Sequence, residues 1–267
     1  MAYQDLTLER DGQIAIMTLR RSEKLNALGE VLHDEIEAVC AEVAADDDVR
    51  ALIITGEGRG FSAGADLTSD RTVDPDAVPS QHERLEEYGW VGRQAMAVYG
   101  LEKPTIAAVN GVAVGAGMSL ALACDLRVGS AQSRFKTVFI ERNLSPDSGM
   151  SYFLPRIVGY SRAVDLIFTS RSVMGEEARE LGLLDRFVEH EQLLEESLKL
   201  ANAIAEWPPL AMRAAKRTVQ RNLQADDLSE ALRNETAGLR YAGLAPNDAK
   251  ESRLSFLEKR PPNFTGT

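Results

Sequence analysis

The sequence predicts an α/β fold in which strands and helices alternate before a purely helical tail. Three observations carry this prediction. Apolar runs lie on either side of Asp11-Gly12, a dipeptide favoured in tight hairpin turns. Apolar residues recur at helical spacing over 29–46 and lead into the β-branched run 51–55, which has the composition of a buried strand. Strand signals stop after Glu191, and only helical patterns follow.

The expected elements follow one another in strand, helix and strand units. The hairpin strands are expected over 6–9 and 14–19, and a crossover through the helix at 29–46 leads to the strand at 51–55. Residues 68–79 are rich in Asp, Ser, Thr and Pro and predict a long loop. The later signals are a helix through 85–98, a strand and glycine-rich turn over 104–118 with a helix at 119–123, and strand or helix patterns at 126–128, 135–140, 152–158, 163–168 and 183–188.

The helical tail begins within the last third of the chain. Helices are expected over 193–205, 209–222, 228–241 and 248–259. We place a boundary near residue 198, with an α/β core over 1–198 and a helical region over 199–267. The apolar faces of this region exceed what one core can cover, so the residues Trp207, Leu210, Met212 and Phe256 are expected to be anchors between subunits.

The composition argues against several classes of protein. The chain has 267 residues, and 30 Lys+Arg against 41 Asp+Glu give a net charge of −11. An acidic chain is not expected to bind nucleic acid or an anionic membrane nonspecifically. No signal peptide pattern and no run approaching ~18 apolar residues is present, so we expect a soluble cytoplasmic protein. Cys40 and Cys124 lack metal or redox spacing and are expected to be buried reduced thiols.

Two glycine-bearing segments at strand exits are candidates for a catalytic site. They span 60–67 and 110–117, and the second opens a helix whose first N–H groups lack intrahelical partners. Two such turns that approach one atom form an oxyanion hole, a site that stabilises negative charge on an oxygen. Either segment alone is more simply a tight turn, so the chemical interpretation depends on the pair.

These segments belong to a set of motifs that resembles the enoyl-CoA hydratase/isomerase family, also called the crotonase family. The resemblance covers nearly the whole chain, with landmarks at Asn26-Ala27-Leu28, Gly60 to Leu67, Lys103 to Gly117, Ala123 to Arg127, Leu154 to Gly159 and Ala178 to Leu183. It implies a spiral of repeated β-β-α units and a C-terminal region that forms trimers, often paired into hexamers. It also implies an acyl-CoA substrate and no separate cofactor, because coenzyme A is part of that substrate.

The resemblance assigns roles to residues of this chain that occupy the family's motif positions. The backbone amides of Ala65 and Ala116 match the two oxyanion-hole donors. Lys24 and Lys259 match basic positions near the CoA phosphates, and Lys259 would act on a neighbouring subunit's ligand. The full set of expected substrate contacts is Lys24, Ala27, Ala63, Gly64, Asp66, Leu67, Gly115, Ser119, Phe139, Met150, Phe256 and Lys259. Either lysine is still equally well explained as a solvated surface charge.

The chain departs from the hydratase pattern at the two catalytic carboxylates. Hydratases have glutamates where this chain has Ser119 and Phe139, and neither side chain can replace a carboxylate as an acid or base. Asp147 instead matches the aspartate of a branch containing 1,2-epoxyphenylacetyl-CoA isomerases and enoyl-CoA double-bond isomerases. One carboxylate suffices for a double-bond shift, because the base that removes a C2 proton can return it at C4. The sequence therefore favours an isomerase in which apolar neighbours such as Phe139 and Met150 raise the pKa of Asp147.

Other interpretations stay open. A hydratase or acyl-CoA hydrolase that uses water, and a catalytically silent acyl-CoA binder, are the alternatives. Asp147 lies in Pro-Asp-Ser-Gly, which is also a routine turn, and Asn143 stands where the isomerase branch usually has glycine, although asparagine tolerates positive φ. His82 alone is more often a surface residue, and Asp125 is more simply a structural hydrogen-bonding group.

Overall fold

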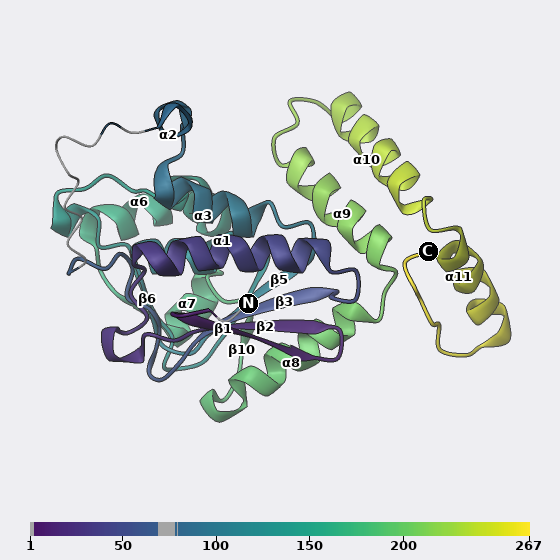
Figure 1. Ribbon diagram of the computed structural model, residues 1–267, viewed down its shortest axis with the longest axis horizontal. Coiled ribbons are helices and arrows are strands. Elements are labelled where there is room, and N and C mark those ends of the chain that lie inside the picture. Colours follow the sequence, from purple (N-terminus) through teal and green to yellow (C-terminus); the bar gives the residue numbers. More distant parts are fainter. Residues whose placement is uncertain (1–2, 69–77, 79) are drawn as a thin grey trace.

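The computed structural model describes residues 3–68, 78 and 80–267, and it contains two sheets (Figure 1). The six-stranded sheet has the order β1 (Leu6–Asp11), β2 (Ile14–Leu19), β3 (Ala51–Gly56), β5 (Thr105–Val109), β7 (Leu126–Gly129), β10 (Arg186–Phe187). The four-stranded sheet has the order β4 (Gly60–Ser62), β6 (Val112–Val114), β8 (Arg134–Lys136), β9 (Val173–Met174). β1 pairs antiparallel with β2, and the pairs β2–β3, β3–β5 and β5–β7 are parallel.

The helices complete the repeating unit of the fold. They are α1 (Glu30–Ala45), α2 (Gln81–Leu85), α3 (Gly89–Tyr99), α4 (Ala116–Ala123), α5 (Met150–Val158), α6 (Tyr160–Thr169), α7 (Gly175–Leu181), α8 (Leu193–Ala205), α9 (Pro209–Asn222), α10 (Leu228–Ala242) and α11 (Pro246–Glu258). Three times the chain runs from the large sheet to the small sheet and then into a helix, as in β5–β6–α4. This is the expected spiral of β-β-α units.

The opening hairpin and crossover are confirmed. β1 and β2 pair in full register from Leu6 opposite Leu19 to Asp11 opposite Ile14, and Gly12 in the turn has a φ of 58°. A positive φ at this place is the conformation that glycine adopts without penalty. β2 then pairs in parallel with β3 after α1, as a strand–helix–strand crossover requires.

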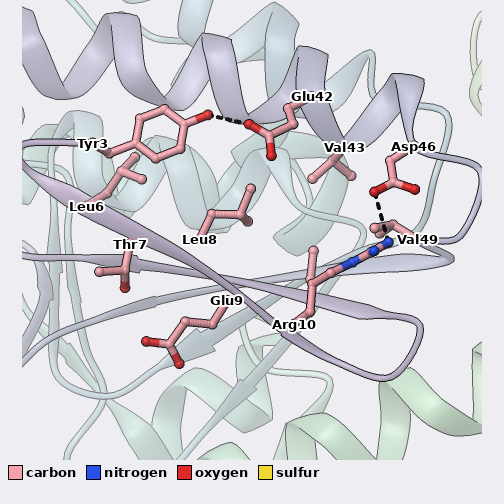
Figure 2. Close-up of a pocket in the computed structure, with 11 residues that line it drawn as sticks. Tyr3, Leu6, Thr7, Leu8, Glu9, Arg10, Glu42, Val43, Asp46 and Val49 are labelled. Atoms are coloured by element: carbon pink, nitrogen blue, oxygen red, sulfur yellow. Dashed lines mark hydrogen bonds and ion pairs between the residues drawn. The ribbon is translucent and has the colours of Figure 1, made fainter. Parts of the chain in front are cut away.

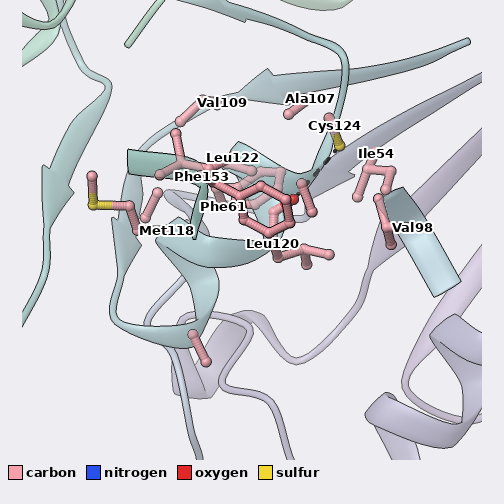
Figure 3. Packing of buried hydrophobic residues seen from close by; sticks show 14 of the residues in the cluster. Ile54, Phe61, Val98, Ala107, Val109, Met118, Leu120, Leu122, Cys124 and Phe153 are labelled. Atoms are coloured by element: carbon pink, nitrogen blue, oxygen red, sulfur yellow. Dashed lines mark hydrogen bonds between the residues drawn. The ribbon is translucent and has the colours of Figure 1, made fainter. Parts of the chain in front are cut away.

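Helix α4 lies at the centre of the larger hydrophobic cluster (Figure 3). All eight of its residues are buried, and five of them are Ala, Gly or Ser, whose small side chains let neighbouring backbones approach closely. Phe61 and Phe153 pack in the same cluster. Cys40 and Cys124 are buried and free, and burial raises the pKa of each thiol to about 12, so both stay protonated at neutral pH.

Two of the expected elements differ from the structure. The single helix expected through 85–98 is divided into α2 and α3, because the carboxylate of Glu86 accepts hydrogen bonds from the backbone N–H groups of Tyr88 and Gly89. Gly89 also has a φ of 61°, which a helix cannot continue through. The helix expected from residue 119 begins at Ala116 instead, directly after the short strand β6.

The tail helices lie within about two residues of their expected bounds, and α9 to α11 extend away from the sheets (Figure 1). Helix α8 crosses the predicted boundary at residue 198 and packs on the large sheet through Leu193, Ala201 and Ala205. Trp207 and Phe256 are 54% and 82% exposed in the single chain. Within the described residues, no helix is both long and apolar enough to cross a membrane.

Helix α9 is attached to the core by ion pairs. The ammonium of Lys216 lies 2.7 Å from Oδ2 of Asp125 and 3.0 Å from the carbonyl oxygen of Lys103, and its side chain is only 8% exposed. Asp125 also accepts hydrogen bonds from the backbone and hydroxyl of Thr105, so it has the structural role expected from the sequence.

We therefore expect Lys216→Met to lower the free energy of unfolding by about 2 kcal/mol, because it removes charge-assisted hydrogen bonds from a partly buried carboxylate. The control is Lys199→Met, which breaks exposed pairs with Glu195 and Glu196 and is expected to leave stability unchanged. Urea denaturation at pH 7 measures both variants. Equal losses would contradict the attachment of α9 described above.

Candidate functional site

The two glycine-bearing turns lie against each other. A Cβ atom placed on Gly64 would lie 2.5 Å from the carbonyl oxygen of Val114 and 3.4 Å from the amide nitrogen of Ala116. A Cβ atom on Gly117 would lie 2.3 Å from the carbonyl oxygen of Ser62. Only glycine permits approaches this close, so the structure brings together the two segments that the sequence predicted to form one site.

The direction of the Ala65 N–H follows from the hydrogen bonds beside it. The N–H of Leu28 donates to the carbonyl oxygen of Gly64 at 2.7 Å, and the N–H of Asp66 donates to the carbonyl oxygen of Leu28 at 3.0 Å. The peptide between Gly64 and Ala65 is trans, so its N–H points opposite to its C=O and away from Leu28. Among the described residues this N–H has no acceptor, and it is open to a ligand oxygen.

The Ala116 N–H is the first amide of helix α4. Gly115 precedes it with a φ of 53° and donates its own N–H to the carbonyl oxygen of Lys136 at 2.9 Å. The first amides of a helix lack partners within the helix and lie at the positive end of its dipole. The Ala116 N–H likewise has no acceptor among the described residues. Two N–H groups without an acceptor among the described residues therefore lie on adjacent turns, as an oxyanion hole requires.

Asn26 and Ser62 fix the first turn from inside the protein. Asn26 is fully buried with a φ of 56°, and its side-chain amide donates to the carbonyl oxygens of Glu57 and Gly60. The hydroxyl of Ser62 donates to the carbonyl oxygen of Asn26 at 2.8 Å and accepts the N–H of Gly64 at 3.3 Å. The landmark Asn26-Ala27-Leu28 thus has a structural reason: it holds the segment that carries Ala65.

Asp66 is held by two cations. Its Oδ2 lies 2.7 Å from Nη2 of Arg21 and 3.1 Å from Nζ of Lys24, and its side chain is 3% exposed. Hydrogen bonds from the Thr68 hydroxyl, then from Arg21, the Thr68 backbone and Lys24, lower the pKa of Asp66 far below its usual value. The Oδ1 of Asp66 also accepts a hydrogen bond from the Thr68 N–H at 2.9 Å, which closes a local turn. Arg21 was not predicted, because its partner lies 45 residues away in the sequence.

Asp147 lies on a loop that is attached to helix α4. The buried hydroxyl of Ser119 donates to the carbonyl oxygen of Asp147 at 3.3 Å, and the hydroxyl of Ser148 donates to its Oδ1 at 2.9 Å. Burial raises the pKa of the carboxyl group, and the bond from Ser148 opposes this in part. The direction agrees with the sequence prediction. Ser119 lies one turn after Ala116 in α4, so the helix that begins at Ala116 also holds the loop that carries Asp147.

Phe139, Asn143 and Met150 lie on either side of Asp147 in the sequence. Phe139 and Met150 are buried in the same hydrophobic cluster as α4. Asn143 has a φ of 56°, so asparagine does adopt the left-handed conformation where the isomerase branch usually has glycine, and its side chain is exposed. Ala27 is buried, and Ala63 donates its N–H to the carbonyl oxygen of Leu25.

The single chain does not bring every expected contact to the turns. Phe256 and Lys259 lie at the end of α11, on the opposite side of the molecule from β6 in Figure 1. Leu67 is 70% exposed, beside the turn. Nearly all of the loop expected at 68–79, and the side chain of His82, lie outside the described residues.

A separate cavity of about 510 Å³ lies between β1 and α1 (Figure 2). The phenol of Tyr3 donates to Glu42 at 2.8 Å, and Arg10 pairs with Asp46 at 2.9 Å on its walls. Neither turn contributes to its lining, so this cavity is not part of the candidate site.

Comparison with known proteins relates the chain to one family. A family model described as enoyl-CoA hydratase/isomerase matches residues 9–267. The chain is 32% identical over 263 residues to the short-chain-enoyl-CoA hydratase of Clostridium acetobutylicum, with 97% of each chain covered. It is 34% identical over 253 residues to the 1,2-epoxyphenylacetyl-CoA isomerase of Escherichia coli, with 95% of each covered. A solved enoyl-CoA hydratase from Bacillus anthracis matches with a TM-score of 0.88 at 29% identity, over 99% of this chain and 100% of that one.

The raised pKa of Asp147 predicts a dependence of stability on pH. Burial favours the neutral acid, so the ionised group costs folding free energy above its folded pKa, and this cost vanishes below the ordinary pKa of aspartate. We expect Asp147→Asn to raise Tm at pH 7 by roughly 2 °C and to have little effect below pH 4. Thermal unfolding across this range, with the exposed Asp226→Asn as control, checks it. A variant less stable than the parent at pH 7 would refute the prediction.

Proposed function

We propose that this chain, which belongs to the enoyl-CoA hydratase/isomerase (crotonase) family of acyl-CoA enzymes, isomerises an enoyl-CoA through a thioester enolate. The observation that carries the proposal is the placement of a half-buried carboxyl group with a raised pKa, Asp147, on a loop bonded to the helix that begins at Ala116. The acyl-CoA carbonyl oxygen accepts hydrogen bonds from the N–H groups of Ala65 and Ala116. No separate cofactor takes part.

The reaction needs one base and one electron sink. The carboxylate of Asp147 removes a C2 proton from a 3-enoyl-CoA, and the electron pair delocalises through the thioester carbonyl, whose oxygen gains negative charge. The two N–H groups stabilise that charge and so lower the pKa of the C2 proton, while burial makes Asp147 a stronger base than an exposed aspartate. The protonated Asp147 then returns the proton at C4, which leaves the double bond between C2 and C3. Atoms balance, since the product is an isomer.

Water addition is the second candidate. Relatives named as hydratases are as similar to the chain as the relative named as an isomerase. Hydration requires a group that activates water, and the two positions where hydratases have glutamates hold Ser119 and Phe139 here. Both side chains are buried, and the Ser119 hydroxyl already donates to the Asp147 carbonyl. These facts favour the isomerase.

The proposal includes a trimer in which α11 reaches a neighbouring site. Lys259 and Phe256 are exposed and remote from the turns of their own chain, so they are free to contact a neighbour's CoA. On α10, the exposed residues Leu228, Leu232 and Leu239 share one helix face, as expected of a surface that another subunit covers.

Deleting one oxyanion donor tests the proposed hole. Ala116 occupies the first position of α4, where proline is tolerated because its missing N–H has no partner in the helix. We expect Ala116→Pro to lower kcat by about 100- to 1,000-fold. The control is Tyr160→Pro, which puts proline at the first position of α6, also after a glycine. Unchanged turnover in a folded Ala116→Pro protein would exclude this donor.

Replacing the base tests the assignment of Asp147. Asparagine keeps the shape and the hydrogen bond from Ser148, but it cannot accept the C2 proton. We expect Asp147→Asn to slow the conversion of 3-enoyl-CoA to 2-enoyl-CoA by at least ~100-fold with little change in binding of the thioester. The same assay follows water addition to 2-enoyl-CoA, which we expect to be weak in the parent. Robust hydration that survives Asp147→Asn would establish the hydratase alternative.

Assembly is tested by mass in solution. We expect multi-angle light scattering to report at least three times the 29.2 kDa monomer at micromolar concentration. Leu232→Glu places a charge on the exposed face of α10 and is expected to shift the protein toward monomer. A parent protein that is monomeric at this concentration would contradict the trimer.

A further inference from the structure

The guanidinium of Arg21 contacts both chain segments that meet at the Ala65 turn. Its Nη1 donates to the carbonyl oxygen of Ala27 at 2.5 Å, on the segment that leads into Leu28. Its Nη2 donates to Oδ2 of Asp66 at 2.7 Å, on the segment that leads out of Ala65. The Arg21 side chain is 14% exposed, so these contacts are shielded from water.

We infer that Arg21 is a positioning residue for the Ala65 amide, and that Lys24, which binds the same Asp66 oxygen, is not. The inference rests on the proposed oxyanion hole and adds to it the group that sets its geometry. The two bonds between Leu28 and the peptides around Ala65 fix where the Ala65 N–H points. Arg21 binds Ala27, which precedes Leu28, and Asp66, which follows Ala65. One side chain therefore links the two segments that these hydrogen bonds join.

Arginine suits this position because its donors form a planar fork. Two N–H groups on different nitrogens reach a carbonyl and a carboxylate at once, and the charge is kept under all conditions. The group is also tightly packed, since a Cβ atom on Gly29 would lie 3.0 Å from Nη1. Its backbone is held in the same turn, where the Arg21 N–H donates to Oδ1 of Asn26 at 2.9 Å.

Lys24 differs from Arg21 in the contacts it makes. Its ammonium binds Asp66 at 3.1 Å and the hydroxyl of Thr68 at 3.0 Å, and both partners lie on one segment. Its side chain is 42% exposed. Loss of Lys24 therefore leaves the side-chain link between the two segments in place, whereas loss of Arg21 removes it and leaves only the two backbone bonds of Leu28. The two cations on one carboxylate provide a matched pair of variants.

The test separates carbonyl polarisation from binding and from turnover. The probe is 4-(dimethylamino)cinnamoyl-CoA, whose absorption moves to longer wavelength when its thioester carbonyl accepts strong hydrogen bonds. We expect Arg21→Met to bind the probe within about threefold of the parent affinity, but to lose at least half of the red shift and about 10- to 100-fold in isomerase kcat. We expect Lys24→Met to bind the probe several-fold more weakly and to keep the full shift of each bound molecule.

A double variant excludes a merely structural effect. Arg21→Met leaves Asp66 with one cation fewer and removes the guanidinium whose Nε lies 3.3 Å from Oδ2 of Asp5, so the variant is expected to be less stable. Arg21→Met with Asp66→Asn removes one of these two carboxylate charges and should recover part of the Tm. The red shift should stay reduced in the double variant. A full shift in folded Arg21→Met, or a shift that recovers together with Tm, would overturn the positioning role. A parent protein without any red shift would instead overturn the oxyanion hole itself, and the inference with it.

Discussion

The site depends first on the two hydrogen bonds between Leu28 and the peptide groups on either side of Ala65. They fix the direction of one N–H, and the buried side chains of Asn26 and Ser62 fix the segments that make them. The second N–H, that of Ala116, depends only on the position of the start of α4. Gly117 lets this helix approach until it contacts Ser62. The proposed hole is therefore a product of backbone geometry, and its most important residues are those that allow close approach.

The chemistry of the site is separate from this backbone frame. In the proposed mechanism the hole accepts any thioester oxygen, whereas the carboxylate of Asp147 decides where protons move. Asp147 lies on a loop with two successive positive φ angles, at Ser148 and Gly149, and in a partly buried environment that raises its pKa. Both features cost stability and persist at functional sites. Family membership thus fixes the acyl-CoA frame, and the proposed reaction depends on one loop.

The sequence predicted most elements because their signals are local. The tail helices have clear apolar periodicity, and proline stands at the first position of both α9 and α11. The start of α4 was missed because all its residues are small or apolar and buried, so no periodic face exists. The break before α3 depends on hydrogen bonds from backbone N–H groups to the Glu86 carboxylate. The role of Arg21 depends on a partner, Asp66, that lies 45 residues away in the sequence. Such interactions between side chains and distant or irregular backbone leave no pattern in the sequence.

The most direct test of the proposed enolate chemistry is the exchange of C2 hydrogens of butanoyl-CoA in D2O, followed by proton NMR. This saturated thioester can neither be isomerised nor hydrated, so its exchange reports only enolate formation between the two N–H donors and Asp147. The parent protein is expected to exchange C2 hydrogen well above the rate in buffer, and Asp147→Asn and Ala116→Pro are each expected to reduce this rate by about 100-fold or more. Exchange no faster than in buffer, or undiminished exchange in either folded variant, would contradict the proposed chemistry.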